Sequence, residues 1–160
     1  MFGNKENAFF SIIASVCPLA TLYDINRQGP PSDCIAFTNL DFESTIHTIK
    51  FLDGQFMFQN IRETPGMCVI FDVKKYTPGN NKYEDYGQSV MPLFSSIPSV
   101  EDNSLELYVN SGIHQLPIYS GLISQDTLTS IRNARDTSAN YGGLTKKVLD
   151  TTLIIKIVDN

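Results

Sequence analysis

The residues best suited to chemistry lie in one polar stretch, FDVKKYTPGNNKYEDYG, which spans residues 71–87 between two apolar runs. Its carboxylates could hold a hard cation such as Ca²⁺, which takes about six to eight oxygen ligands. Its tyrosines are large, rigid and amphipathic, and such side chains are enriched at protein interfaces. The stretch is therefore suited to a metal site, to a membrane or protein contact, or to a simple reversal of the chain. The residues that we select as interaction candidates are Lys74, Lys75, Tyr76, Tyr83 and Tyr86.

Nucleophilic catalysis needs a base beside the nucleophile, and the chain has only 2 histidines to serve as that base. His47 alternates with Ile49 and Phe51, which predicts a half-buried position on a strand. His114 has no local partner, and Cys68 lies within the apolar run MCVIFD rather than on an exposed turn. An enzyme would need a pocket that joins a histidine to acidic residues, for which the candidates are Glu43, Glu84, Asp85, Glu101 and Asp102. We therefore expect no catalytic residues and no enzymatic activity.

Metal and phosphate motifs are also missing from the sequence. Zinc sites need Cys and His at short spacings such as C-x-x-C, and neither residue type shows such a spacing. The nearest approach to a phosphate-binding loop is Gly142-Gly143, which is more typical of a turn. We therefore expect no cofactor and no metal.

The 3 cysteines bear on the cellular compartment. Cys17, Cys34 and Cys68 cannot all pair, and Cys17 and Cys68 lie in apolar runs, where a free thiol behaves as a small hydrophobe. The chain also has no Asn-x-Ser/Thr acceptor for glycosylation. These features favour a reducing, intracellular location.

The length and composition predict one globular domain. A chain of 160 residues with 42% hydrophobic and 18% charged residues can bury a sizeable core and is too short for two comfortable domains. The net charge is -5 and the few Lys and Arg are scattered, so the sequence has no basic stripe to bind nucleic acid. The same scarcity of clustered Lys and Arg argues against docking to anionic lipid. The domain could still be one part of a longer polypeptide.

The start of the chain, MFGNKENAFFSIIASVCPLA, resembles a secretory signal peptide in having a short apolar run behind one Lys. Glu6 does not fit a basic leader, and Pro18 interrupts the run. The run is also shorter than the about 20 apolar residues that a transmembrane helix needs. We favour a first core element here.

The candidate residues must be positioned mainly by strands, because β-branched and aromatic residues occur in short runs separated by Gly, Pro, Asn and Asp. One stretch, residues 124–135, has helical spacing behind a possible N-cap at Ser124 or Asp126. This pattern predicts an all-β fold, a two-sheet antiparallel β-sandwich with one short helix. The expected strands span residues 9–16, 19–25, 34–38, 45–51, 55–60, 67–73, 87–93, 105–109, 113–118 and 152–158.

Two strand predictions are specific. Asp53-Gly54 is a hairpin signal that predicts antiparallel pairing between IHTIKF and QFMFQN, with Phe56 and Phe58 toward the core. The run MCVIFDV shows no alternation, which is typical of a central strand covered on both faces.

The order of these segments resembles a C2 domain, an eight-stranded β-sandwich used for membrane and protein docking. The segments that match are GQFMFQN, GMCVIFDV, KKYTPGNNKYE and DYGQSVMPL, from about Ile46 to Phe94, with YVNSGIHQLPIY and TTLIIKI as later strands. The resemblance implies that Asp72 lies at the first calcium-ligand position of its loop. Lys74 and Lys75 follow where a second acid should lie, and Asp41 and Glu43 are the candidates from the other loop. We therefore expect a calcium-independent member of the family.

With calcium and lipid disfavoured, we expect a non-catalytic interaction module of the cytoplasm. C2-like modules with a PLF…G…LP ending resemble those of cytoskeletal and ciliary proteins, which implies a structural role at microtubules or in the axoneme of a cilium or flagellum. The implied partners are proteins of a large assembly, with tubulin and axonemal proteins as candidates. The alternatives are a peripheral membrane C2 domain that binds lipid without calcium, and a secreted ligand-binding sandwich.

Overall fold

The computed structural model describes residues 8–18, 35–44, 49–59, 61–102, 104–120 and 146–159. Within these residues the chain forms strands and turns and no helix, so the all-β prediction is confirmed. The predicted helix at 124–135 and the predicted strand at 19–25 lie outside the described residues. His47 also lies outside them.

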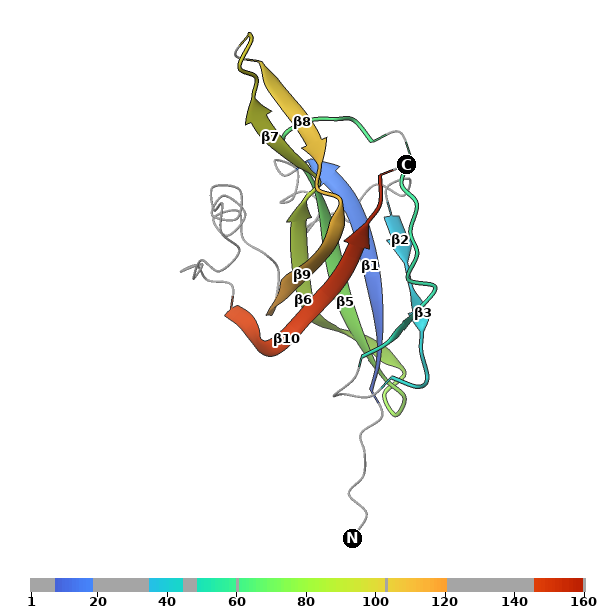
Figure 1. Cartoon of the computed structure of the whole chain (residues 1–160). Helices are drawn as coiled ribbons and strands as arrows, with labels where there is room; N and C mark the ends of the chain where they lie inside the picture. Colours follow the sequence, from blue (N-terminus) through green and yellow to red (C-terminus); the bar gives the residue numbers. More distant parts are fainter. Residues whose placement is uncertain are drawn as a thin grey trace.

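One antiparallel sheet of six strands dominates the described fold (Figure 1). Its order is β10 (Lys146–Ile157), β9 (Gly112–Ser120), β6 (Lys82–Pro92), β5 (Met67–Thr77), β1 (Phe9–Pro18) and β2 (Ile35–Phe37). The remaining described strands form two ribbons, β3 (Asn39–Leu40) with β4 (Phe51–Leu52) and β7 (Phe94–Pro98) with β8 (Leu105–Val109). In Figure 1 the β7–β8 ribbon and the turn between β5 and β6 lie at opposite ends of the sheet.

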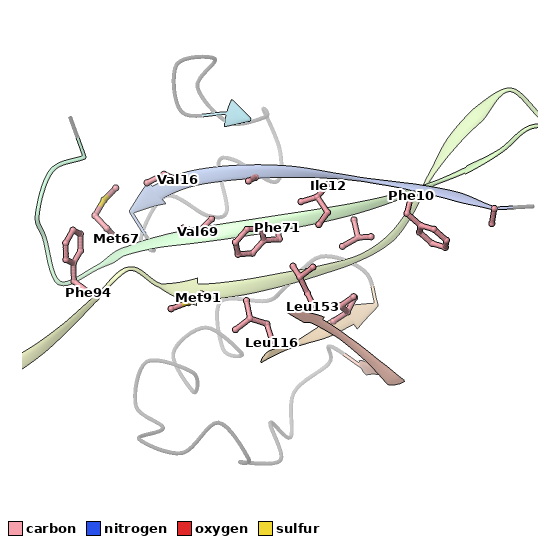
Figure 2. Close-up of a cluster of buried hydrophobic side chains, with 14 residues drawn as sticks. Phe10, Ile12, Val16, Met67, Val69, Phe71, Met91, Phe94, Leu116 and Leu153 are labelled. Carbon is pink, nitrogen blue, oxygen red and sulfur yellow. The ribbon is translucent and has the colours of Figure 1, made fainter. Parts of the chain in front are cut away.

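The core covers one face of the six-stranded sheet. Side chains at alternate positions of a strand share a face, so β1 contributes its even-numbered residues, from Phe10 to Val16. Figure 2 shows these side chains gathered with those of Val69 and Phe71 from β5, Met91 from β6 and Leu153 from β10. The segment at 49–61 packs partly buried hydrophobic side chains against this cluster.

The opposite face of the two inner strands is also buried. Cys17 of β1 and Cys68 of β5 point to that face, and each is only 2% exposed. Residues 67–71 of β5 are buried without a break. This burial on both faces confirms the prediction that MCVIFDV is a central strand, since alternation is lost when neither face meets water.

The predicted Asp53-Gly54 hairpin is wrong in its pairing. The chain does turn at Asp53, whose φ of 53° lies in the left-handed region, but β4 pairs with β3. A hydrogen bond of 2.7 Å from Asn39 Nδ2 to Asp53 Oδ2 holds the turn against β3. Residues 54–59 form no strand, yet Phe56 and Phe58 pack against the core as predicted.

The predicted strands at 67–73 and 87–93 left residues 74–86 as a polar connection, and this is also wrong, because most of these residues extend β5 and β6. The two strands pair from Cys68↔Pro92 to Thr77↔Lys82, with one irregularity after Val73. Only residues 78–81 form the turn, where Asn81 adopts a φ of 49° and the Asn80 amide donates to the Thr77 carbonyl at 3.1 Å. A four-residue turn of this kind closes a hairpin without a long loop.

Candidate functional site

The five candidate residues lie on both faces of the distal part of the β5–β6 hairpin. Lys74, Tyr76 and Tyr83 lie on the face opposite the core, because cross-strand partners share a face. Lys75 lies on the core face opposite Phe10 of β1. Tyr86 also points to the core face, where its ring packs edge-on against Phe10 with centroids 5.1 Å apart. The structure therefore brings together three of the five residues and separates the other two from them.

Lys74 lies between two carboxylates. Its Nζ is 2.8 Å from Asp72 Oδ2 and 2.5 Å from Asp85 Oδ1. Partial burial lowers the pKa of Lys74, but hydrogen bonds and charge attraction from Asp72 and Asp85 outweigh that effect and raise the pKa above its usual value. The ammonium group thus supplies a positive charge at the position where the C2 likeness places a calcium ligand. Within the described residues no three Asp, Glu, His or Cys side chains are grouped to hold a metal ion.

An aromatic row runs across the face opposite the core, from the turn after β3 to β6. The Phe42 and Phe9 rings meet edge-on with centroids 5.1 Å apart, and Phe9 lies directly opposite Tyr76 in the β1–β5 register. Tyr76 and Tyr83 rings are again 5.1 Å apart, tilted by 44°. The Tyr76 hydroxyl donates to Asn81 Oδ1 at 2.9 Å, which fixes the ring against the turn. We define the aromatic row as Phe42, Phe9, Tyr76 and Tyr83.

The two ends of the aromatic row are exposed and its centre is buried. Phe42 is 74% exposed and Tyr83 is 59% exposed, whereas Phe9 is 8% exposed. The exposed rings at the two ends therefore offer rigid apolar area, because each of them packs against a ring nearer the centre of the row. The sequence prediction missed Phe9 and Phe42. Alternation along β1 could have placed Phe9 opposite the core, but no local signal links Phe42 to the hairpin.

A second exposed apolar surface lies on the β7–β8 ribbon, which we call the arm. Its acidic residues are Glu101, Asp102 and Glu106, and the sequence has no Lys or Arg between Lys82 and Arg132. The Tyr108 hydroxyl donates to a Glu106 carboxylate oxygen, which raises the pKa of the Tyr108 phenol. The large apolar side chains that the arm exposes are Ile97, Val100, Leu105 and Tyr108. The sequence analysis predicted no functional role for this surface.

The described residues that could serve catalysis are dispersed. His114 lies on β9, and its Nε2 is 3.0 Å from the backbone carbonyl of Asn110. Glu43 forms an ion pair of 3.1 Å with Lys50, and Glu84 lies opposite Lys75 on the hairpin. Glu101 and Asp102, also predicted as acidic candidates, lie in the exposed turn of the arm.

Comparisons of the chain with protein-family models, with curated proteins and with solved structures find no match. The C2 likeness therefore stays a prediction based on the quoted segments. In the described part of the chain, no helix has the length and apolar character needed to cross a membrane.

Proposed function

We propose that this chain is a non-catalytic docking module that attaches to a protein assembly through the aromatic row. The observation that carries the proposal is the arrangement of Phe42, Phe9, Tyr76 and Tyr83, whose ends are exposed while its centre is packed. Binding energy at protein interfaces is concentrated in a few aromatic and Arg side chains. Rings held in place before binding lose little conformational entropy when a partner covers them.

A protein is a better partner than a lipid surface for this row. Tyr76 contributes a hydroxyl that is already hydrogen-bonded to Asn81, and the only cation on the same face of the hairpin, among the described residues, is Lys74. That ammonium group is neutralised by Asp72 and Asp85. An acidic chain with net charge -5 gains nothing from the negative potential of an anionic membrane.

The fold that we propose for residues 1–160 is a calcium-independent C2-like β-sandwich. Support comes from the antiparallel strands, from the core on one face of the six-stranded sheet, and from the 49–61 segment that packs against this core. The Lys74 ammonium between Asp72 and Asp85 supports the calcium-independent assignment. Within such a sandwich, the 49–61 segment and the β3–β4 ribbon would belong to the second layer.

The proposed setting is the cytoplasm, at the cytoskeleton or the axoneme of a cilium or flagellum. Its support is the likeness of the PLF…G…LP segments to C2-like modules of cytoskeletal and ciliary proteins. The proposed partners are tubulin or axonemal proteins, with neither a cofactor nor a substrate. The dispersed positions of His114 and the described acidic residues support the non-catalytic assignment.

The test uses the purified chain and microtubules polymerised from purified tubulin. We expect the wild-type chain to sediment with microtubules and the double variant Phe42→Ser, Tyr83→Ser to lose most of that binding. The matched control is Ile113→Ser, Ile154→Ser, which removes two apolar side chains that are 75% and 69% exposed elsewhere on the sheet. A tagged copy should localise to the cytoskeleton or axoneme and lose that location in the same double variant.

Two results would reject the proposal. Equal loss of binding in the row variant and the control variant would show that the row has no special role. Binding of the wild-type chain to anionic liposomes, with no protein partner in cells, would favour the membrane alternative instead.

A further inference from the structure

Two cysteines face each other across the β1–β5 pair. Cys17 is the penultimate residue of β1 and Cys68 is the second residue of β5, and the register places them directly opposite each other. Their Sγ atoms are 3.9 Å apart, and each residue is 2% exposed. Both thiols are free, and the Cys68 thiol donates to the Cys17 carbonyl at 3.4 Å.

The backbone positions suit a covalent bond between these two sulfur atoms. Directly opposed residues of antiparallel strands have Cα atoms about 4.5 to 5.5 Å apart, within the about 4.4 to 6.8 Å that disulfides span. Only the side chains must rotate to bring the sulfur atoms from 3.9 Å to about 2.05 Å. We propose that Cys17 and Cys68 are a site of reversible oxidation, at which a peroxide converts the two thiols into a cross-strand disulfide.

The two thiols differ in how readily they ionise. The hydrogen-bonding contact between the two sulfur atoms lowers the pKa of Cys17, although burial acts against this. The same sulfur–sulfur contact, burial and the charge of an ionised Cys17 raise the pKa of Cys68. The Cys17 carbonyl accepts the Cys68 thiol proton at 3.4 Å, so Cys68 keeps its proton and Cys17 is the sulfur that we assign as the one that attacks the oxidant.

The reaction with hydrogen peroxide proceeds in two balanced steps. The Cys17 thiolate attacks one peroxide oxygen, the O–O bond breaks, and the leaving hydroxide takes the proton released from Cys17 to form water. The Cys68 sulfur then attacks the sulfenic acid of Cys17. The S–S bond forms, the S–O bond breaks, and the leaving oxygen takes up the Cys68 proton to form a second water. Two thiols are oxidised and one peroxide is reduced.

Access to the buried pair comes from the ends of the strands. Pro18, which follows Cys17, is exposed, and β1 ends there as a strand. Local opening of one strand end costs no more than global unfolding, so the proposal requires the end of β1 to open for a small oxidant and does not require the whole sheet to unfold. The pair lies at the opposite end of β1 from Phe9, on the same face of the sheet. Oxidation therefore leaves the aromatic row in place.

The experiment exposes the purified full chain to graded hydrogen peroxide, then alkylates the remaining thiols under denaturing conditions. We expect the intact mass to fall by about 2 Da before alkylation, from loss of two hydrogens. Peptide mapping should find Cys17 linked to Cys68, with Cys34 alkylated in the same molecules. Dithiothreitol should restore both thiols, and the oxidised chain should melt at a higher temperature, because the bridge restricts the unfolded state.

The decisive variant is Cys34→Ser, which keeps both members of the pair and removes the competing thiol. It should form the same link at the same peroxide concentration. Cys17→Ala and Cys68→Ala should abolish the 2 Da loss. The proposal is overturned if oxidation of the Cys34→Ser variant stops at sulfenic or sulfinic acid, or if its disulfides join separate molecules. It is equally overturned if Cys34 is the preferred partner in the wild-type chain.

Discussion

Gly87 is the residue at which a single added methyl group should be most disruptive. It lies on β6 where β9 passes close, next to the Gln88↔Tyr119 pair that joins the two strands. A Cβ at Gly87 would lie 2.6 Å from Ile118 Cγ2 and 2.6 Å from the Tyr119 carbonyl oxygen. Ile118 is a side chain that can rotate away, but the Tyr119 carbonyl is part of the β9 backbone. The substitution Gly87→Ala must therefore push β9 away from β6.

The size of the effect follows from the contacts at this crossing. Ordinary contact begins near 3.4 Å, so the Tyr119 carbonyl must move by about 0.8 Å. Overpacking of this kind destabilises a protein by about 1 to 3 kcal/mol. The same movement strains the hydrogen bond of 2.6 Å from Ser89 Oγ to the Pro117 carbonyl, which contributes about 0.5 to 1.5 kcal/mol. We expect Gly87→Ala to lower the free energy of unfolding by roughly 2 to 4 kcal/mol.

Urea-induced unfolding followed by circular dichroism measures this loss directly. A domain of this size should also melt roughly 4 to 16 °C lower. The matched control is Gly66→Ala, because a Cβ at Gly66 meets nothing within 4 Å. That control should leave the free energy of unfolding unchanged or raise it by up to about 1 kcal/mol, since alanine restricts the unfolded chain more than glycine does. If Gly87→Ala is as stable as Gly66→Ala, the close approach of β9 to β6 is wrong.

Three further substitutions test the core, a buried hydrogen bond and the ion pair, each by urea unfolding. Phe10→Ala should destabilise the fold by about 3 to 5 kcal/mol, whereas Phe37→Ala, at a side chain that is 70% exposed, should change stability by less than about 0.5 kcal/mol. Thr38→Val should lose about 1 to 3 kcal/mol, because the buried Ile12 amide donates to Thr38 Oγ1 at 2.9 Å, whereas Thr38→Ser keeps that acceptor. Lys74→Met should lose at most about 1 kcal/mol near pH 7, because solvent screens the Asp85 carboxylate, whose side chain is 76% exposed. Folding raises the pKa of Lys74 above its ordinary 10.5, so the wild-type chain should keep its full excess in free energy of unfolding over the variant below pH 10.5. That excess should shrink as the pH rises through the folded-state pKa. An excess that grows at high pH would contradict the ion pair.

A strand was predictable from the sequence where the pattern of apolar residues alone indicated which of its faces are buried. The run at 67–73 is apolar without alternation and is buried on both faces, so its composition was sufficient to identify a central strand. The Asp53-Gly54 signal correctly predicted a turn but predicted the wrong pair of strands around it. Asp53 is held by a hydrogen bond from Asn39, a residue 14 positions earlier in the chain. A local turn signal carries no information about a contact with a residue so far away in the chain. Strand pairing was therefore the part of the fold that could not be predicted from the sequence.

The distal part of the β5–β6 hairpin was mispredicted for a related reason. Lysines, acids and asparagines between Lys74 and Asp85 are typical of loops, but cross-strand partners neutralise or pack them. Lys74 meets Asp85, and Tyr76 meets Tyr83. The interaction candidates were thus identified by residue type, while their division between two faces required the register.

One strand register connects the two sites to which we assign roles. The β1–β5 pairing runs without a break from Phe9↔Tyr76 to Pro18↔Met67, so a single alignment places Phe9 beside Tyr76 and Cys17 beside Cys68. The alignment is determined by the even-numbered residues of β1, because Phe10, Ile12 and the following even positions must enter the core. A shift of one residue would expose that core and would move Phe9 and Cys17 to the other face together. The aromatic row and the cysteine pair are therefore consequences of the same core packing, although docking and oxidation are tested by independent experiments.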